Sequence, residues 1–406
     1  MIDIFKNKGY QIGEFNKFAD IYVVNTCTVT SMSDKKSRQI LRRAKHLNPN
    51  SILCAVGCYA QVAKDELEKI EDIDIILGNI EKKDIIEEIE KFQKNSNKTV
   101  HVENIMHLMP YADYDGIAYT NHARAEIKIQ DGCDRFCSYC IIPYARGPVR
   151  SRNPESIIKE IKKIAQKGIK EVVITGIHIS SYGKDFKDMK KSYALIDLLE
   201  EINKIEGIER IRLGSLEPRI ITKEFVERLI KLEKICNHFH LSLQSGCNET
   251  LERMNRKYII EDFKNIVKIL RENIPDVALT TDVIVGFPGE TDEEFKKTEE
   301  FLKEIKFSKM HIFKYSKRKG TPAASFLNQV SDGKKEERSN ILLEMSAKNE
   351  KEFAEKYIGS EIEVLFENAK EGHTKNYIKV IRKDNNEGVE IKRVIPVIWK
   401  EEALYL

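Results

Sequence analysis

Three cysteines in the segment DGCDRFCSYC have a type and spacing suited to iron–sulfur chemistry. Cys133, Cys137 and Cys140 have three and two residues between them, so a single loop can bind three corners of one cubane cluster. The fourth iron then has no protein ligand and can chelate the amino and carboxylate groups of S-adenosylmethionine (SAM). Electron transfer through that iron can break the sulfonium C–S bond and give a deoxyadenosyl radical. The cofactors supply this chemistry, and the protein supplies the geometry.

Other uses of these thiols are open alternatives. Structural zinc takes four tetrahedral ligands, and neither a fourth cysteine nor a nearby downstream histidine completes the loop. A disulfide scaffold is disfavoured because eight cysteines in 406 residues are sparse and three cannot all pair with one another. A chance group of core cysteines is the remaining alternative.

The first 95 residues alternate strand and helix, which predicts a parallel α/β domain. The apolar runs 21–25, 52–56 and 73–77 are the expected strands, separated by amphipathic helices. Residues 93–123 are polar and irregular, with Pro110, and we expect a linker there. A second domain should begin with a strand at 125–130.

Further strand-like runs at 171–176, 210–215, 238–244, 278–287 and 309–316, separated by helical segments, predict six βα units extending to about residue 349. We therefore expect an open, partial (βα)6 barrel with its active site at the carboxyl ends of the strands, where the cysteine loop lies. The tail from 352 to 406 has short alternating runs and Gly and Asn turns, which predict a small all-β barrel.

Composition bounds the function classes. With 41% hydrophobic and 33% charged residues the chain is typical of soluble globular proteins, and 406 residues favour two or three domains. No run has the length and apolarity of a spanning helix, and the start lacks a signal-peptide core, so we expect a cytoplasmic protein without a membrane partner. The net charge of +3 does not by itself indicate nucleic-acid binding.

The segment IKIQDGCDRFCSYCIIPYARGPVRSR resembles the radical SAM loop of the methylthiotransferase family. The resemblance covers the chain: 1–92 is similar to the family's N-terminal domain, 119–349 to the radical SAM core and 352–406 to the TRAM domain. TGIHISSYGKD, HFHLSLQSG, MNRKY, TDVIVGFPGE and FKYSKRKGTPAA are most similar to one branch. That branch converts N6-threonylcarbamoyladenosine (t6A), next to the anticodon of ANN-decoding tRNA, into its 2-methylthio derivative.

This resemblance implies two [4Fe-4S] clusters and SAM as cofactors. One SAM yields the radical that activates adenine C2, sulfur comes through the second cluster, and another SAM supplies the methyl group. Cys133, Cys137 and Cys140 match the ligands of the radical SAM cluster. Cys27, in NTCTVT, and Cys58, in VGCYAQ, match two ligands of the second cluster. From their positions alone, Cys27 and Cys58 could equally form one shared site or be two separate buried thiols.

The family's second cluster uses a third cysteine in a loop ahead of the position where this sequence begins, so we expect a truncated start. The chain as written should hold that cluster poorly and bind about four irons rather than eight. Cys54 lies inside a strand and is expected to be a core residue. Cys236 and Cys247 are expected to be packing or loop thiols.

A SAM pocket needs polar strand ends, close backbone approach and an apolar wall. The expected SAM contacts are Gly176, Glu217, Gln244 and Arg256, with Asp282 to Gly286 on the adenine side and Phe136 and Tyr139 inside the cysteine loop. A place in a barrel layer or a helix cap is the alternative for each.

For RNA, the segment DKKSRQILRRAKH places Lys35, Arg38, Arg42 and Lys45 on one helix face just after Cys27, where they could follow phosphates. A solvated helix face is the alternative. Arg146, Arg150 and Arg152 add charge beside the cysteine loop. Residues 351–406 hold ten Lys/Arg and eleven Asp/Glu, so only a one-sided face there could attract RNA. Its candidate members are Lys375, Lys379, Arg382 and Lys383.

Three competing functions remain at this point. The same clusters serve a branch that methylthiolates an aspartate of a ribosomal protein and a branch that acts on isopentenyl-adenosine in tRNA. An RNA-binding protein with a structural cluster is disfavoured, because such a cluster normally has four protein ligands. The expected partners are tRNA and a reductant such as flavodoxin or ferredoxin, and the expected state is a monomer.

Overall fold

The computed structural model describes residues 1–107, 110–111, 123–186, 193–382 and 388–406. The chain forms two compact units. The first unit comprises Met1–Ala118, Gly132–Arg150 and Ser316–Ser325, and the second comprises Tyr119–Asp131, Ser151–Tyr315 and Phe326–Leu406. The boundaries 1–92, 119–349 and 352–406 stay predictions, and residue 119 lies outside the described residues. Within the described ranges, none of the helices combines the length and the apolar character needed to span a bilayer.

The first unit is built on a sheet of four parallel strands that follow the chain order β1-β2-β3-β4. The strands are β1 Ile21–Thr26, β2 Ile52–Gly57, β3 Ile75–Leu77 and β4 Thr99–His101. The helices are α1 Ile2–Asn7, α2 Ser31–Leu47, α3 Cys58–Val62, α4 Lys64–Glu68, α5 Ile85–Asn95 and α6 Ile142–Arg146. The predicted parallel α/β sheet is confirmed.

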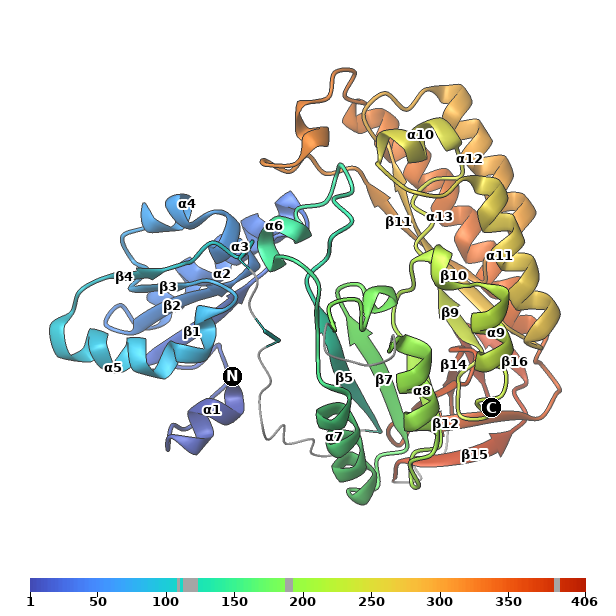
Figure 1. Ribbon diagram of the computed structural model, residues 1–406, viewed down its shortest axis with the longest axis horizontal. Helices are drawn as coiled ribbons and strands as arrows, with labels where there is room; N and C mark the ends of the chain where they lie inside the picture. Colours follow the sequence, from blue (N-terminus) through green and yellow to red (C-terminus); the bar gives the residue numbers. More distant parts are fainter. Residues whose placement is uncertain (108–109, 112–122, 187–192, 383–387) are drawn as a thin grey trace. The chain divides into compact units, whose positions relative to one another are not determined.

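Apolar side chains cover both faces of this sheet. Leu41 and Ala44 of α2 and Leu67 of α4 pack with Leu53 on one face, and Ile85 and Ile89 of α5 pack with Val56 on the other. Figure 1 shows α4 and α5 on opposite sides of this sheet. Helix α2 begins after Thr30, whose side chain accepts a hydrogen bond from the Ser33 N–H. Such caps fix the start of the helix directly after β1.

Strand β4 corrects the expectation of an irregular linker from 93 to 123. Helix α5 continues to Asn95, and Thr99–His101 pairs in parallel with Ile75–Leu77. The sequence signal was weak because the strand has only three residues at a sheet edge, where Thr and Val are the only β-favouring side chains.

In the part of the second unit that the structure describes, six parallel strands make up the barrel region. The sheets β6-β5-β7-β8 and β11-β10-β9 are linked by bridges from Ile211 to Ile235 and from Leu216 to Leu241. The strands are β5 Arg124–Asp131, β6 Arg150–Ser151, β7 Glu171–Gly176, β8 Arg210–Leu213, β9 His238–His240, β10 Ala278–Val285 and β11 Lys309–Lys314. The parallel strands β5, β7, β8, β9, β10 and β11 form the predicted partial barrel, although β9 is shorter than the expected 238–244.

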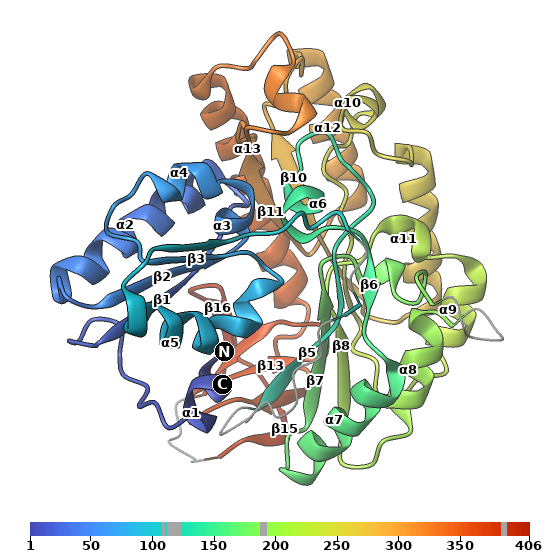
Figure 2. The same ribbon diagram turned by 60° about the vertical axis from the view of Figure 1, so that its left-hand side comes forward.

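Helices cover the outer side of these strands (Figure 2). They are α7 Pro154–Gln166, α8 Leu195–Asn203, α9 Lys223–Leu229, α10 Asn248–Arg253, α11 Ile260–Asn273, α12 Asp292–Ile305 and α13 Asp332–Glu355. One apolar core joins alternate strand residues, such as Ile127, Ile174 and Val283, to helix residues such as Ile161 and Leu302. The other side of these strands includes polar residues such as Lys128, Arg212 and Thr280.

The C-terminal part is all β, as expected. Its strands are β12 Ile362–Phe366, β13 Glu371–Thr374, β14 Lys379–Ile381, β15 Glu390–Val394, β16 Ile398–Lys400 and β17 Ala403–Tyr405, in the order β15-β12-β13-β14-β17-β16. It docks on the amino ends of barrel strands. Arg212 bonds Glu171 Oε1 at 2.7 Å and the Lys375 carbonyl at 3.0 Å, and Arg210 bonds Glu363 Oε1 at 2.9 Å.

Candidate functional site

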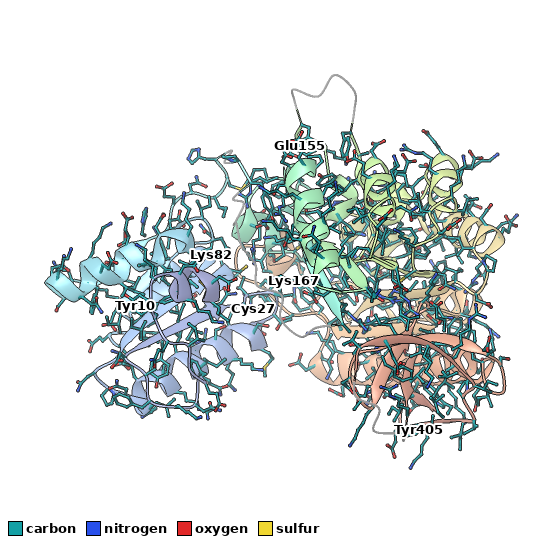
Figure 3. The ribbon with its side chains drawn as sticks, turned by 90° about the horizontal axis from the view of Figure 1, so that it is seen from below. Tyr10, Cys27, Lys82, Glu155, Lys167 and Tyr405 are labelled. Carbon is teal, nitrogen blue, oxygen red and sulfur yellow. The ribbon has the colours of Figure 1, made fainter. Side chains whose placement is uncertain are left out.

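Two cysteines follow neighbouring strand ends in the first unit. Thr26 of β1 is paired with Gly57 of β2, and the next residues along the chain are Cys27 and Cys58. Gly57 has φ +101, and a Cβ there would lie 2.5 Å from Asn25 Oδ1, so glycine is required at this turn. Cys27, labelled in Figure 3, is exposed. The sheet therefore brings both thiol-bearing residues to its carboxyl edge, where open α/β folds bind ligands.

The sulfur of Cys58 is held by two nitrogen donors. Arg146 Nε donates to it at 2.9 Å and Asn79 Nδ2 at 3.6 Å. Asn79 Nδ2 also donates to the Ala145 carbonyl at 2.7 Å, which ties α6 to the end of β3. Sequence reasoning missed Asn79, whose only signal was its position directly after a strand end.

The cysteine loop runs from the end of β5 into α6. Its two ends are joined by a hydrogen bond of 3.0 Å from the Cys133 N–H to the Gly147 carbonyl, and the Cys140 N–H donates to the Cys137 carbonyl at 2.9 Å. Gly132 has φ +75, and a Cβ on it would lie 1.8 Å from the Pro148 carbonyl oxygen, so the closure requires glycine. Cys137 is buried, and Cys133 and Cys140 are half-buried. Burial raises the pKa of Cys133.

A second segment, residues 316–325, joins the two cysteine-bearing regions. The Ala323 N–H donates to the Ser138 carbonyl at 2.8 Å, between two cysteines of the loop. At the other end, the buried Arg318 pairs with Asp34 Oδ2 at 2.7 Å and bonds the hydroxyl of Thr28, next to Cys27. The sequence showed this segment only as a stretch of family resemblance.

The donor set fits an iron–sulfur cluster better than zinc. Across the residues that the structure describes, no three His, Cys, Asp or Glu side chains converge as ligands of a single metal ion. Each thiolate of a cubane binds a different iron, so its ligands need not converge in that way. Three thiols on one closed loop suit three corners of a cubane, and the four-ligand zinc alternative finds no support here.

The other cysteines are structural, as expected. Cys54 is fully buried in the core beneath α5, and burial raises its pKa. Cys236 is buried, with its pKa raised to about 11 by the same cause. Cys247 is buried and donates to Glu249 Oε2 at 2.9 Å.

The expected SAM contacts lie in the second unit, apart from Phe136 and Tyr139 in the loop. Gly176 ends β7, and a Cβ there would lie 3.0 Å from the Gln130 carbonyl oxygen. Glu217 follows β8 and accepts from Arg219 Nε at 2.8 Å, and Gln244 holds φ +73 after β9.

Two further expected SAM contacts already have protein partners. Arg256 donates to the Ser242 carbonyl at 2.9 Å, and Asp282 of β10 lies 3.3 Å from His240 Nε2. Their SAM-binding role and that of Gly176, Glu217 and Gln244 stay predictions.

The four basic residues of α2 that were predicted to bind RNA differ in their exposure. Lys35 and Arg42 are exposed, but Arg38 donates to the Tyr59 hydroxyl at 2.5 Å and Lys45 pairs with Asp74 at 3.1 Å. Only the exposed members present their charge fully to solvent, and RNA binding by all four stays a prediction.

The arginines beside the loop also bind protein groups. Arg146 contacts Cys58, Arg150 donates to the Arg146 carbonyl at 2.9 Å, and Arg152 donates to Ser156 Oγ at 3.0 Å. Arg150 and Arg152 are each only 7% exposed. Their RNA contacts stay predictions. The hydrogen bond from Arg146 of α6 to Cys58 was not indicated by the spacing of these residues in the sequence.

The predicted basic face of the C-terminal part is largely paired within the chain. Lys379 binds Glu371 at 3.0 Å and Arg382 binds Glu390 at 2.6 Å. Lys375 lies 3.5 Å from the Glu233 carbonyl oxygen. Lys383 lies outside the described residues.

Comparison with known proteins adds a family context. The chain matches the model of the Radical SAM superfamily over residues 127–302 and that of "Uncharacterized protein family UPF0004" over 1–78. It is 44% identical over 390 residues to the Threonylcarbamoyladenosine tRNA methylthiotransferase MtaB of Bacillus subtilis (strain 168), covering 94% of this chain and 86% of that one. Identity to the protein of the same name from Aquifex aeolicus (strain VF5) is 43% over 397 residues, covering 97% and 96%.

A tRNA-2-methylthio-N(6)-dimethylallyladenosine synthase of Clostridium tetani (strain Massachusetts / E88) is 37% identical, with coverage of 92% and 82%. Among solved structures, the radical SAM methyltransferase TsrM from Kitasatospora setae has a TM-score of 0.55 at 17% identity, covering 76% of this chain and 67% of that one. That last likeness concerns the fold alone.

Proposed function

Because the chain belongs to the radical SAM tRNA methylthiotransferases, in the threonylcarbamoyladenosine branch, we infer that it adds a methylthio group to C2 of t6A in tRNA. Identities of 44% and 43% to the B. subtilis and A. aeolicus relatives exceed the 37% to the C. tetani dimethylallyladenosine enzyme, and a third relative named MtaB, from Thermotoga maritima, is also 37% identical. This order favours t6A over isopentenyl-adenosine as the substrate.

One structural observation carries the proposal: the first unit gathers both groups of cysteines. The loop with Cys133, Cys137 and Cys140 is tied to the sheet edge by the bond from Arg146 to Cys58, and segment 316–325 is tied to Ser138 and to Thr28. Radical formation and sulfur insertion need reactive groups near one substrate atom, and the bonds between these loops support the proposal.

The chain's own residues have defined tasks in this scheme. Cys133, Cys137 and Cys140 hold the [4Fe-4S] cluster of the radical SAM family, and the closure at Gly132 and Gly147 fixes the loop that carries them. When bound, that cluster and SAM supply the radical chemistry. Gly176, Glu217, Gln244, Arg256 and Asp282 are proposed to hold SAM at the strand ends of the second unit.

A second cluster is proposed at Cys27 and Cys58. The paired strand ends before them and the two donors on the Cys58 sulfur support it. The two thiols can occupy two corners of a cubane. Iron counting after anaerobic reconstitution of wild type and Cys58→Ala tests this proposal: fewer irons per chain in the variant would support it, and equal counts would contradict it.

The remaining partners are part of the proposal. A reductant such as flavodoxin or ferredoxin would supply the electron, and the chain would act as a cytoplasmic monomer on the anticodon loop of ANN-decoding tRNA. Nucleoside mass spectrometry of tRNA from cells with and without the gene tests the function. Loss of 2-methylthio-t6A is expected, whereas unchanged tRNA with an altered ribosomal-protein mass would overturn it.

A further inference from the structure

We propose that Phe136 and Tyr144 form a stacking platform for the target purine of tRNA. The inference rests on the proposed function and deepens it by naming residues that position the substrate. Their rings make an edge-to-face pair with centroids 5.8 Å apart and an interplanar angle of 76°. Phe136 on the cysteine loop is 37% exposed and Tyr144 on α6 is 38% exposed, so both aromatic residues are partly open to solvent.

The backbone at Phe136 holds an unusual conformation. Its φ is +46, in the left-handed region that bulky side chains rarely adopt. Such conformations persist where the surrounding structure enforces them, and they cluster at functional sites. Here the enforcing contacts are the loop closure from Cys133 to Gly147 and the turn from Cys140 to Cys137.

Helix α6 sets the direction of Tyr144. Ala145 is buried with its carbonyl bonded to Asn79, and Arg146 reaches Cys58, so these residues face the first sheet. Successive helix residues are separated by 100°, which leaves Tyr144 on a different side from Arg146. On that side the ring of Tyr144 contacts the ring of Phe136, which directly precedes Cys137 in the sequence.

The chemistry of an exposed ring pair fits a nucleobase. Bases of a single-stranded loop can be splayed out and stacked on Tyr or Phe side chains. SAM also carries an adenine, and Phe136 was an expected SAM contact. We assign the pair to tRNA because Tyr144 lies beyond the cysteines, on α6, and each of the two residues is more than a third exposed.

The test is a cycle of binding measurements with the anaerobically reconstituted protein. Wild type and Tyr144→Leu are each titrated with an anticodon stem–loop that contains t6A and with the same RNA abasic at that position. Tyr144→Phe keeps the ring and should bind like wild type. Phe18→Leu is the matched control, since Phe18 is an exposed aromatic residue, 72% accessible, in the segment before β1. SAM affinity is measured in parallel.

Tyr144→Leu should bind the t6A loop about tenfold more weakly and the abasic loop unchanged, with SAM affinity and iron content as in wild type. Phe136→Leu should also weaken binding of the t6A loop more than binding of the abasic loop, and its iron content is checked because Phe136 adjoins Cys137. Equal weakening of both RNAs by both variants, or a loss of SAM affinity instead, would overturn the platform. Failure of wild type itself to bind the t6A loop would instead contradict the proposed function.

Discussion

The ion pair between Arg318 and Asp34 should control the stability of the Cys27 region. Both side chains are largely buried, 8% and 13% exposed, and the pair is 2.7 Å long. Removing one partner of such a pair costs about 3–5 kcal/mol. Asp34 lies in the first turn of α2, where the helix dipole stabilises a carboxylate by about 0.3–1 kcal/mol, so part of the loss is offset. We expect about 3 kcal/mol for Arg318→Met.

Hydrogen exchange measured by mass spectrometry suits this prediction, because a chain of two units need not unfold in one step. A loss of about 3 kcal/mol should speed exchange in peptides covering 27–47 roughly 100-fold. Lys319→Met is the matched control: this neighbouring lysine is 94% exposed and 4.0 Å from Glu66, a pair worth about 0–1 kcal/mol. Less than threefold acceleration for Arg318→Met, or an equal effect of Lys319→Met, would refute the reasoning.

Three further predictions follow from particular contacts. Burial alone would raise the pKa of Glu367, but the hydrogen bond with His373 and the charge of Arg124 outweigh it, so the pKa of Glu367 is lowered. This stabilisation is present above the unfolded glutamate pKa of about 4.3 and is lost as pH falls through the lower folded value. Fluorescence of Trp399, the single tryptophan, should therefore report loosening of the C-terminal sheet in acid, with a weaker pH dependence in Glu367→Gln. For tRNA binding, Arg42→Gln should reduce the slope of log affinity against log salt by about 1, and an unchanged slope would remove Arg42 from the RNA contacts. Gly57→Ala should lower the free energy of unfolding by about 1–3 kcal/mol, because Gly57 has φ +101 and an added Cβ would lie 2.5 Å from Asn25 Oδ1. Hydrogen exchange in peptides covering β2 and α3 should therefore be faster than in wild type. Exchange at the wild-type rate would contradict this.

The sequence predicted most of the architecture because its signals are local. Long apolar runs such as 171–176 coincide with β7, and the alternation of strand and helix identified both parallel sheets. The short edge strand β4 was missed because three residues give little periodicity. The length of β9 was overestimated, since apolar alternation continues through Leu243 although regular pairing stops at His240.

Side-chain partners were harder to predict than cysteine positions. Spacing placed Cys133, Cys137 and Cys140 on one loop, but it could not show that Arg146 reaches Cys58 or that Arg318 reaches Asp34. Those bonds join segments 88 and 284 residues apart, counting 146 − 58 and 318 − 34, so they depend on tertiary folding. Spacing likewise could not show that Arg38 and Lys45, two of the residues predicted to bind RNA, have partners within the chain.

Methylthiolation of t6A can be tested directly with the purified protein. The anaerobically reconstituted protein is incubated with SAM, a reductant, a sulfur source and t6A-containing tRNA, and the digested nucleosides are analysed by mass spectrometry. We expect 2-methylthio-t6A in the wild-type reaction and none with Cys137→Ala. Formation of deoxyadenosine with t6A left unmodified, or methylthiolation of isopentenyl-adenosine tRNA in preference to t6A tRNA, would contradict it.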